Sequence, residues 1–501
     1  MLKKWTQTTY AYVTIVVTLC LGILSYFMSM GLNGNDFWWH IKAGNWILSN
    51  HAFPKYDMFS WYAQEIGLKW TAHEWLSEVI FAVVYNIGGQ YGIFLFSFIA
   101  AAILLILLVS VCKEYTVNNI IYTVIFLIFT TMLFKIYCFG RPHLFSFFLL
   151  FFELKCLYDF IENRSEKSIY FIPLIALLWA NFHGGSSNLS YVLCIFVIIT
   201  GAFNFRLGKV VFTKLENAKL IKLAGAAITS MIAICINPYG THMLAYPYEN
   251  MADKIMLKLI AEWAAPDAKE IAILIFFFMP FAFGLLTLIA TEKDINATDL
   301  IIFAFFSYMF FRSGRFIVFL MISLPFYTFR YAPKMVTLNN PESKADKLVS
   351  SGLIGLFSII ILMGLFNGYT SNKNGILVKR ELDTKFIDLI KSEAPSRPFT
   401  DYNYGGELIF SDVQVYVDGR ADVYTGEPIR DYCSLYSLLN HDVNDTSKDK
   451  AHFLTKLLDK YQFDAFLIDK ERALTTYLYE NSDKYELVEQ DENTAYFRVV
   501  K

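Results

Sequence analysis

The segment NDFWWHIKAGNWILSN, residues 35–50, comes directly after an apolar run over about residues 10–32. An apolar run of about 20 residues is long enough to cross a bilayer as a helix. Adjacent tryptophans such as Trp38 and Trp39 suit a membrane–water boundary, because their rings are apolar and carry one hydrogen-bond donor. This does not explain Asp36 and His40 in the same segment. The segment therefore predicts that the chain leaves a membrane here and presents chemically active side chains at once.

The composition places the whole chain among membrane proteins. Of its 501 residues, 55% are hydrophobic and only 18% are charged, which is too apolar for an ordinary soluble protein. The net charge of −2 argues against a nucleic-acid partner. The seven cysteines lie mostly in apolar runs without metal-type spacing, so neither a disulfide framework nor a metal motif is indicated.

Repeated apolar runs predict a polytopic α-helical membrane protein with about eleven transmembrane helices. The first run is longer than a signal-peptide core and lacks a cleavage site, so we expect it to remain as a span. The apolar piece 75–87 is too short to cross alone, and is expected to be an interfacial helix or an extension of the second span. The predicted spans are 10–32, 89–112, 119–138, 143–161, 169–183, 188–204, 221–237, 271–291, 299–313, 315–330 and 349–368.

The distribution of lysine and arginine predicts the orientation. With a cytoplasmic N-terminus, the inner segments hold fifteen of these residues and the outer loops hold nine, although the outer loops are longer in total. This bias follows the positive-inside rule. An odd number of spans then places the C-terminal part outside the cytoplasm, in a multi-pass protein of the cell membrane.

The chain is expected to have two parts. Residues 1–368 form the transmembrane domain with large outer loops 33–75 (the first loop) and 237–270, and residues 369–501 (the tail) form an extracytoplasmic soluble α/β domain. In the tail, the alternating stretches VQVYVDGRADVY (413–424) and FDAFLID (463–469) predict strands. KFIDLIKSEA (385–394) and HFLTKLLDKY (452–461) have helical spacing.

Under this topology, ionisable residues from five separate segments collect on the outer side. Such groups are costly at membrane depth, and they usually line a cavity or pair with each other. Each also has a simpler explanation: Arg312 and Arg315 as interfacial anchors, His183 as a helix-end histidine, His73 with Glu74 as a helix cap, and Asp57 as a turn former. The set comprises Asp36, His40, Asp57, His73, Glu74, Arg141, His143, His183, Glu262, Asp267, Arg312 and Arg315.

Glycosyl transfer fits such a set of residues. Nucleotide sugars are absent outside the cytoplasm, so transfer there uses a sugar linked to a lipid phosphate. The reaction needs a carboxylate to accept the proton of the acceptor. It also needs a cation to stabilise the departing phosphate, either arginine or a carboxylate-held divalent metal. These residue types are supplied by Asp36, Glu262, Arg141, Arg312 and Arg315.

The segments NDFWWHIKAGNWI and FPKYDMFSWYAQE resemble the first outer loop of GT-C superfamily glycosyltransferases, above all the catalytic subunit of oligosaccharyltransferases. The resemblance implies a polyprenyl-phosphate-linked donor and makes Asp36 the catalytic or metal-binding acid. DYNYGGELIF (401–410) followed by VYVDGRADVY (415–424) is similar to the acceptor-recognition segment of that subunit, Trp-Trp-Asp-Tyr-Gly followed by a strand.

The chain departs from the family pattern at two places. Asn403 stands where the central aspartate of the acceptor segment belongs, and both tryptophans are missing. The acidic pair of the next outer turn is replaced by Arg141, Pro142 and His143. Metal dependence and an asparagine acceptor are therefore both open.

The resulting site prediction assigns catalysis to Asp36 and Glu262, with the same two residues as candidate ligands of Mg²⁺ or Mn²⁺. The predicted substrate-binding residues are His40, His73, Glu74, Arg141, His143, His183, Arg312, Arg315, Tyr402, Asn403, Tyr404, Asp418 and Arg420.

The leading hypothesis is a membrane glycosyltransferase that moves a sugar or glycan from a polyprenyl-phosphate donor to a glycan, lipid or protein acceptor on the outer membrane face. A polysaccharide polymerase or ligase would also need outer arginines and a lipid groove. A transporter would place ionisable residues near the midplane, on broken helices and paired repeats, and the sequence lacks both. The remaining alternative is a membrane protein without catalytic activity.

Overall fold

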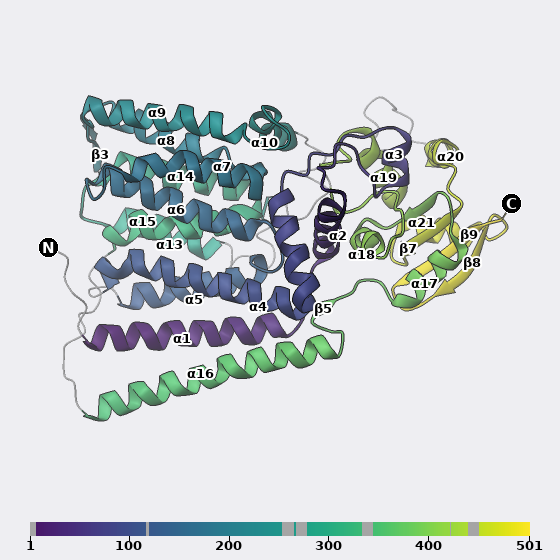
Figure 1. Ribbon diagram of the computed structural model, residues 1–501, viewed down its shortest axis with the longest axis horizontal. Helices are drawn as coiled ribbons and strands as arrows, with labels where there is room; N and C mark the ends of the chain where they lie inside the picture. Colours follow the sequence, from purple (N-terminus) through teal and green to yellow (C-terminus); the bar gives the residue numbers. More distant parts are fainter. Residues whose placement is uncertain are drawn as a thin grey trace. The chain divides into compact units, whose positions relative to one another are not determined.

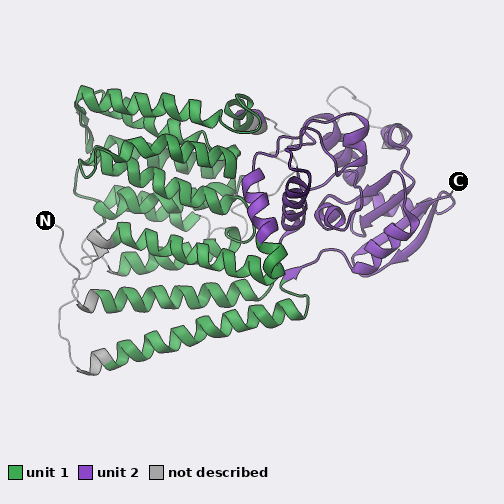
Figure 2. Cartoon of the chain, viewed as in Figure 1, with its two compact units in different colours: residues 1–32, 84–247, 262–377 green, residues 33–83, 248–261, 378–501 purple. Residues whose placement is uncertain are grey.

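The computed structural model describes residues 7–116, 120–252, 265–266, 278–332, 344–420, 422–438 and 450–500. It consists of two compact units (Figure 2). Unit 1 comprises residues 1–32, 84–247 and 262–377, and unit 2 comprises residues 33–83, 248–261 and 378–501. The first loop and the tail therefore fold together in unit 2, although most of the apolar helices lie between them in the sequence.

Unit 1 consists mainly of long helices that lie side by side (Figure 1). Short 3₁₀ turns, η1 (Ser168–Phe171), η2 (Gly184–Ser186), η4 (Gly314–Phe316) and η5 (Thr328–Arg330), precede or follow several of them. Two of the helices, α4 and α10, extend into the residue ranges of unit 2. The helices are α1 (Gln7–Ser29), α4 (Trp75–Thr116), α5 (Ile120–Tyr137), α6 (His143–Ile161), α7 (Ile172–Phe182), α8 (Leu189–Gly201), α9 (Asn217–Ile234), α10 (His242–Ala252), α13 (Met279–Ala290), α14 (Ala297–Arg312), α15 (Ile317–Tyr327) and α16 (Lys344–Lys373).

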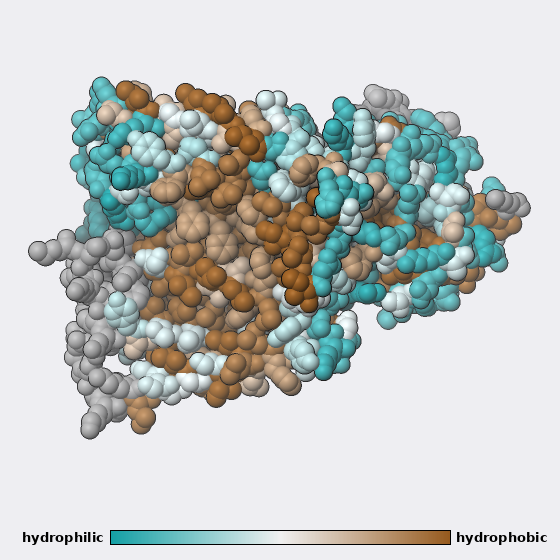
Figure 3. Space-filling model, viewed as in Figure 1, coloured by the Kyte–Doolittle hydropathy of each residue, from teal (hydrophilic) through white to brown (hydrophobic). Residues whose placement is uncertain are grey.

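Each of the eleven predicted runs overlaps one of these helices. By length and composition, five helices of the described chain can cross a membrane, over Tyr10–Ser29, Trp75–Cys112, Gly184–Gly201, Asn217–Ile234 and Leu348–Lys373. Shorter apolar helices cover Ile121–Tyr137, Ser168–Phe182 and Met279–Ala290. Hydrophobic side chains dominate the middle of the helical face seen in Figure 3. These are the features of a membrane protein, whereas eleven spans remains a prediction.

Small residues allow the helices of unit 1 to approach closely. A Cβ atom added to Gly364 of α16 would lie 2.5 Å from Ser25 Oγ of α1. Asn367 Nδ2 donates a hydrogen bond to Ser29 Oγ at 2.9 Å between the same two helices. Glycine and serine at a helix contact are typical of membrane-spanning helices, because close backbone approach maximises van der Waals packing.

Helix α4 explains the short apolar piece 75–87. This piece is the first part of α4 and continues into the second predicted span, with a break at Gly89, where φ is +58°. Glycine adopts this left-handed conformation at little cost, because it has no Cβ atom. Residues 75–88 thus form a helix that is joined to the second predicted span at a kink, and its role as an interfacial helix or as an extension of the span stays a prediction.

The strands form small sheets. In unit 1, β2 (Phe205–Leu207) pairs antiparallel with β3 (Val210–Phe212), which pairs parallel with β4 (Ile295–Asn296). Unit 2 has a four-stranded sheet in the order β6-β7-β9-β8. Its strands are β6 (Pro398–Thr400), β7 (Ala465–Asp469), β8 (Tyr485–Gln490) and β9 (Thr494–Val499). Two short strands, β1 (Leu32–Asn33) and β5 (Val378–Lys379), complete the set.

Helices of the first loop and of the tail complete unit 2. Two come from the first loop, α2 (Asn35–Asn50) and α3 (Trp61–Glu65). Those from the tail are α17 (Thr384–Glu393), the 3₁₀ turn η6 (Tyr402–Tyr404), α18 (Gly405–Phe410), α19 (Glu427–Ser437), α20 (Lys450–Tyr461) and α21 (Ala473–Glu480). The helices predicted over 385–394 and 452–461 and the strand predicted over 463–469 are thus present.

The strand predicted over 413–424 is absent. This stretch makes a single parallel bridge, between Val415 and Ser60 of the first loop, and is otherwise irregular. The four residues from Val415 to Asp418 are all fully buried, so the chain is enclosed on every side instead of alternating between core and solvent. The Trp61 ring stacks on Tyr416 with ring centroids 5.7 Å apart. The first loop therefore contributes to the core of the tail.

Candidate active site

Asp36 lies in the first turn of α2. The residue in the N-cap position is Gly34. Asp36 thus lies at the positive end of the helix dipole, which favours its ionised carboxylate. The helix position is fixed by burial of Phe37, Trp38 and Ile41.

Two glycines of the tail pack against this first turn. A Cβ atom at Gly419 would lie 2.5 Å from Asp36 Oδ1, and one at Gly406 would collide with the carbonyl oxygen of Asn35. The side chain of Trp39 donates a hydrogen bond from Nε1 to Asp36 Oδ1 at 3.2 Å. The Asp36 carboxylate is therefore held between its own helix and the backbone of the tail.

The adjacent tryptophans Trp38 and Trp39 are core residues of unit 2. Trp38 is 1% exposed and Trp39 is 7% exposed. The ring of Trp38 packs on Phe410 of α18, with ring centroids 4.9 Å apart. Burial of large aromatic rings dominates core energetics, so these residues fix α2 against the tail.

The predicted acceptor segment, residues 401–410, contacts Gly419. The hydroxyl of Tyr402 donates a hydrogen bond to the carbonyl oxygen of Gly419 at 3.1 Å. Asp401 Oδ1 accepts a hydrogen bond from the Asn403 N–H at 3.1 Å, which caps η6, and burial raises the pKa of Asp401. Tyr404 is buried and its hydroxyl pairs with Thr494. Tyr402 and Asn403 are half-buried and thus remain partly accessible.

Arg420 locks the first loop to the tail. Its guanidinium pairs with Asp57 of the first loop and donates to Asp418 Oδ2 at 2.6 Å. It also lies over the rings of Phe59 and Trp70, with centroid distances of 4.9 and 4.7 Å. Burial acts to lower the pKa of Arg420, but the carboxylates of Asp418 and Asp57 raise it well above its ordinary value.

Both Asp418 and Arg420 have fully buried side chains. In this structure they position the loop, and direct contact with a substrate remains a prediction. Asp57 also forms the expected turn, because its Oδ2 accepts a hydrogen bond from the Ser60 N–H at 2.7 Å.

His40, His73 and Glu74 form a second buried group in unit 2. His40 Nδ1 lies 3.7 Å from Glu74 Oε2, and His73 Nε2 lies 3.3 Å from Glu74 Oε1. Burial acts to lower the pKa of His73, but the Glu74 carboxylate outweighs it and the pKa is raised. The sequence reasoning missed Glu78, which also faces His40 at 3.5 Å. Its spacing of four residues from Glu74 was the available signal.

The remaining predicted residues belong to unit 1. The rings of His143 and His183 are 4.6 Å apart, and His183 Nδ1 is 2.5 Å from Ser146 Oγ. Arg141 is partly exposed in the turn before α6. Arg312 is exposed at the end of α14, and Arg315 in η4 lies over the ring of Phe316. Glu262 and Asp267 lie outside the described residues.

A metal ion held by Asp36 and Glu262 stays a prediction, because Glu262 lies outside the described residues. Asp36 uses Oδ1 for Trp39, and it does not belong to the group of histidine and carboxylate ligand atoms that gathers around His40. Metal binding at Asp36 remains a proposal.

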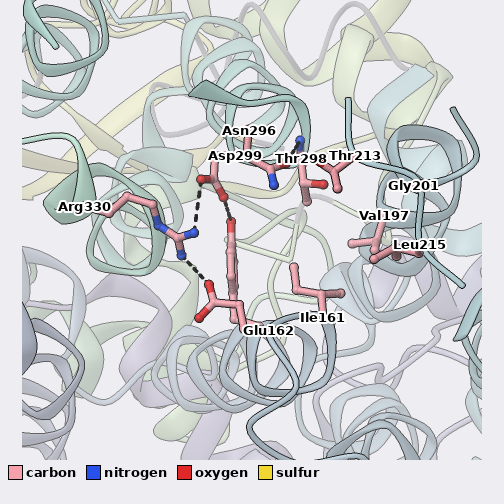
Figure 4. A pocket seen from close by; sticks show the side chains of 11 residues that line it. Ile161, Glu162, Val197, Gly201, Thr213, Leu215, Asn296, Thr298, Asp299 and Arg330 are labelled. Carbon is pink, nitrogen blue, oxygen red and sulfur yellow. Dashed lines mark hydrogen bonds and ion pairs between the residues drawn. The ribbon is translucent and has the colours of Figure 1, made fainter. Parts of the chain in front are cut away.

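Unit 1 also has a cavity of about 150 Å³, which is lined by Tyr158, Glu162, Asp299 and Arg330 among others (Figure 4). Asp299 is buried there and accepts hydrogen bonds from Tyr158 and Tyr331 at 2.7 and 2.6 Å. Arg330 donates to Glu162 at 2.6 Å and lies 3.5 Å from Asp299. The cavity lies where α6 ends and α14 begins, at helix ends that the charge bias predicts to face the cytoplasm.

Solved structures with a similar fold are known for this chain, whereas no family model and no curated protein sequence matches it. Among solved structures, it is similar to the oligosaccharyltransferase of Archaeoglobus fulgidus in the apo form, with a TM-score of 0.50 and 11% identity over 94% of this chain and 70% of that one. It is also similar to the oligosaccharyltransferase AglB of Archaeoglobus fulgidus in complex with an inhibitory peptide and a dolichol-phosphate, with a TM-score of 0.51 and 10% identity over 93% of this chain and 70% of that one. The expected resemblance to the oligosaccharyltransferase catalytic subunit is thus confirmed for the fold.

Proposed function

We propose that the protein is a membrane glycosyltransferase that moves a sugar or glycan from a polyprenyl-phosphate-linked donor to an acceptor on the outer face of the cell membrane. One observation carries the proposal: the Asp36 carboxylate lies at the start of α2, against Gly419 of the tail, in a chain with an oligosaccharyltransferase fold. The acid expected from the sequence and the segment expected to recognise the acceptor therefore meet at one point.

The local geometry suits proton transfer. The acceptor hydroxyl gives its proton to Asp36, its oxygen forms a bond to the anomeric carbon, and the bond from that carbon to the lipid phosphate breaks. Attack from the side opposite the phosphate inverts the configuration. Trp39 donates to the same carboxylate and so fixes its orientation.

The departing lipid phosphate needs positive charge. Arg141, Arg312 and Arg315 are the candidates, because they are partly or fully exposed at ends of helices predicted to face the outer side. Mg²⁺ or Mn²⁺ held by Asp36 and Glu262 is the alternative source of that charge. Loss of activity on chelation that excess Mg²⁺ restores would favour a metal at Asp36, whereas retention of activity would favour the arginines.

The comparisons support the donor class. One structural neighbour is a complex with a dolichol-phosphate, which is a polyprenyl-type lipid phosphate, and with an inhibitory peptide. The charge bias supports a cytoplasmic N-terminus and an extracytoplasmic tail in a multi-pass protein. The acceptor is then a glycan, a lipid or a protein residue on the outer side.

The acceptor is not expected to be the Asn-x-Ser/Thr sequon. Asn403 takes the place of the aspartate in the family pattern, and it can accept a hydrogen bond but carries no negative charge. We predict that the purified protein does not glycosylate a sequon peptide from any lipid-linked donor that it otherwise uses. Efficient glycosylation of that peptide would contradict this prediction.

The donor class can be tested with purified full-length protein. A panel of radiolabelled hexoses linked to polyprenyl phosphate is supplied together with cell-envelope extract as the acceptor source, and the same hexoses are supplied as nucleotide sugars. We expect incorporation of label and release of polyprenyl phosphate from at least one lipid-linked donor, and none from the nucleotide donors. Incorporation from the nucleotide sugars alone would overturn the proposal.

A further inference from the structure

One histidine of α2 lies close to two carboxylates in unit 2, Glu74 just before α4 and Glu78 in its first turn. His40 Nδ1 lies 3.5 Å from Glu78 Oε1 and 3.7 Å from Glu74 Oε2. Ligand atoms of these three residues all lie within 4.8 Å of one another. His40 is 3% exposed, Glu74 is 8% exposed and Glu78 is 1% exposed. We call this group the His40 cluster.

The two carboxylates of the cluster lie close together. The Glu78 N–H donates to the Glu74 carbonyl oxygen at 3.0 Å, which places both side chains one helical turn apart on one face. Two buried carboxylates that lie this close together repel each other. His73 faces Glu74 Oε1 at 3.3 Å, and Arg420 of the same unit pairs with Asp57 and Asp418. A cation held between Glu74 and Glu78 would offset their repulsion.

Glu78 adds an independent sign of a missing ligand. Its Oε2 atom is completely buried and has no hydrogen-bond partner in the part of the chain that the structure describes. A buried carboxylate oxygen without a partner is costly, because it has lost its water and gained nothing in exchange. Native proteins satisfy such atoms with a hydrogen bond or an ion.

The spacing of the donor atoms suits a bound cation. A zinc-type ion holds nitrogen and oxygen ligands at about 2.0–2.2 Å, so neighbouring ligand atoms in a tetrahedral site lie about 3.3–3.6 Å apart. The two distances from His40 Nδ1 are within about 0.1 Å of this range. Two carboxylates and a neutral imidazole would balance a divalent ion, and three protein ligands leave one position open.

The backbone is arranged to keep this spacing. Gly44 lies one turn after His40 on α2, and a Cβ atom there would collide with the Glu78 carbonyl group and lie 2.8 Å from Ala82 Cβ. Only glycine allows α2 to approach α4 so closely. The ring of Trp39 lies over His40 with ring centroids 3.7 Å apart, which limits rotation of the imidazole.

We propose that His40, Glu74 and Glu78 bind a divalent transition-metal ion, with Zn²⁺ or Mn²⁺ as the matching class. The nitrogen ligand disfavours Ca²⁺ and Mg²⁺, which take oxygen ligands. The ion ties α2 to the start of α4 one helical turn beyond Asp36. Its role is therefore to position the helix that carries the proposed acid, at a site distinct from Asp36 itself.

Manganese binding to the full-length protein tests the proposal directly. The purified protein is stripped with a chelator, Mn²⁺ is titrated in, and free Mn²⁺ is followed by electron paramagnetic resonance. We expect a saturable site at one equivalent, with a pulsed-resonance coupling to a directly bound nitrogen. Zn²⁺ should displace the Mn²⁺, and a large excess of Mg²⁺ should not.

Two isosteric variants and two controls locate the ion. Glu78→Gln should weaken Mn²⁺ binding by at least tenfold, and His40→Gln should abolish the nitrogen coupling. Asp36→Asn should leave the affinity and the nitrogen coupling of this site unchanged, because Asp36 lies outside the cluster. Glu407→Gln should also leave both unchanged, since Glu407 is a buried glutamate of the same unit that lies outside the cluster.

Three results would overturn the proposal. They are the absence of stoichiometric binding, the absence of nitrogen coupling in the wild type, and loss of binding in Asp36→Asn with retention in Glu78→Gln. The wild-type nitrogen coupling needs no variant, so a misfolded variant cannot hide the answer. No transfer assay is involved, and failure of the metal site is thus distinguished from failure of the proposed transferase.

Discussion

At the scale of single residues, a methyl group at residue 419 would lie 2.5 Å from Oδ1 of Asp36. Gly419→Ala should therefore displace the carboxylate from Trp39 while leaving most of the fold in place. A shift of about 1 Å in a catalytic group costs up to about a hundredfold in rate, so we predict at least a tenfold loss of transfer. The rate of sugar transfer and the thermal midpoint of the purified variant check this.

A glycine in open space provides the control for Gly419→Ala. Gly225 in α9 has no atom within 4 Å of an added Cβ, so Gly225→Ala should transfer at the wild-type rate. Equal activity of the two variants would show that the contact between Asp36 and Gly419 is unimportant for transfer.

Glu407 gives unit 2 a pH-dependent stability. Burial raises the pKa of Glu407 from 4.5 to about 7. The folded state then holds a proton that the unfolded state releases, so stability is lost as the pH rises from about 4.5 to about 7. The full effect is on the order of 3 kcal/mol. We predict that the thermal midpoint of the wild type decreases as the pH is raised from 5 to 8. In Glu407→Gln this decrease should be smaller.

The glutamine variant is a close control in this case. Its amide oxygen can still accept the hydrogen bond that Glu407 Oε1 receives from the Glu381 N–H at 2.7 Å. Identical pH profiles of the two proteins would show that Glu407 does not titrate in this range.

At the scale of elements, the contact between the first loop and the tail depends on Arg420. Removing one partner of a buried, hydrogen-bonded ion pair costs about 3–5 kcal/mol, because the other charges stay buried without compensation. Arg420→Met would leave the carboxylates of Asp57 and Asp418 buried without a compensating positive charge. We predict a fall in the thermal midpoint of unit 2 by roughly 10 °C, together with protease cleavage in the first loop.

An exposed ion pair between the same elements is the matched control. Lys42 of α2 pairs with Asp412 of the tail at 2.5 Å, and the side chain of Asp412 is 77% exposed. Exposed pairs contribute about 0–1 kcal/mol, so Lys42→Met should change the midpoint little. A similar fall for both variants would refute the special role of Arg420.

The sequence patterns predicted some helices and strands correctly and others wrongly. Apolar runs predicted the helices well, because in a membrane the backbone must satisfy its own hydrogen bonds. The alternating pattern at 413–424 predicted a strand wrongly. There the residues from Val415 to Asp418 are enclosed by the first loop and the tail together, so alternation did not reflect one buried face and one exposed face. This enclosure depends on contacts distant in sequence.

At the scale of the whole molecule, the sequence indicated the fold and the residues around Asp36. It could not indicate that residues 33–83 and the tail form one compact unit, because long-range packing has no local signal. For the same reason it missed Glu78 in the His40 cluster and the buried Asp299 in unit 1. Glu78 carried one local signal, its spacing of four residues from Glu74, and the partners of both acids come from segments distant in sequence.

The central claim is that Asp36 is the acid of a glycosyl-transfer site, and Asp36→Asn tests it most directly. Asparagine preserves the shape of the side chain and removes its charge. The measurement is the rate of sugar transfer from a polyprenyl-phosphate donor, for the purified variant and for the wild type. The thermal midpoint of the variant is measured as well and should equal that of the wild type. We predict a loss of about a hundredfold or more, the usual scale for a general base. Near-normal transfer by Asp36→Asn would contradict the account and would make Glu262 the next candidate for the active acid.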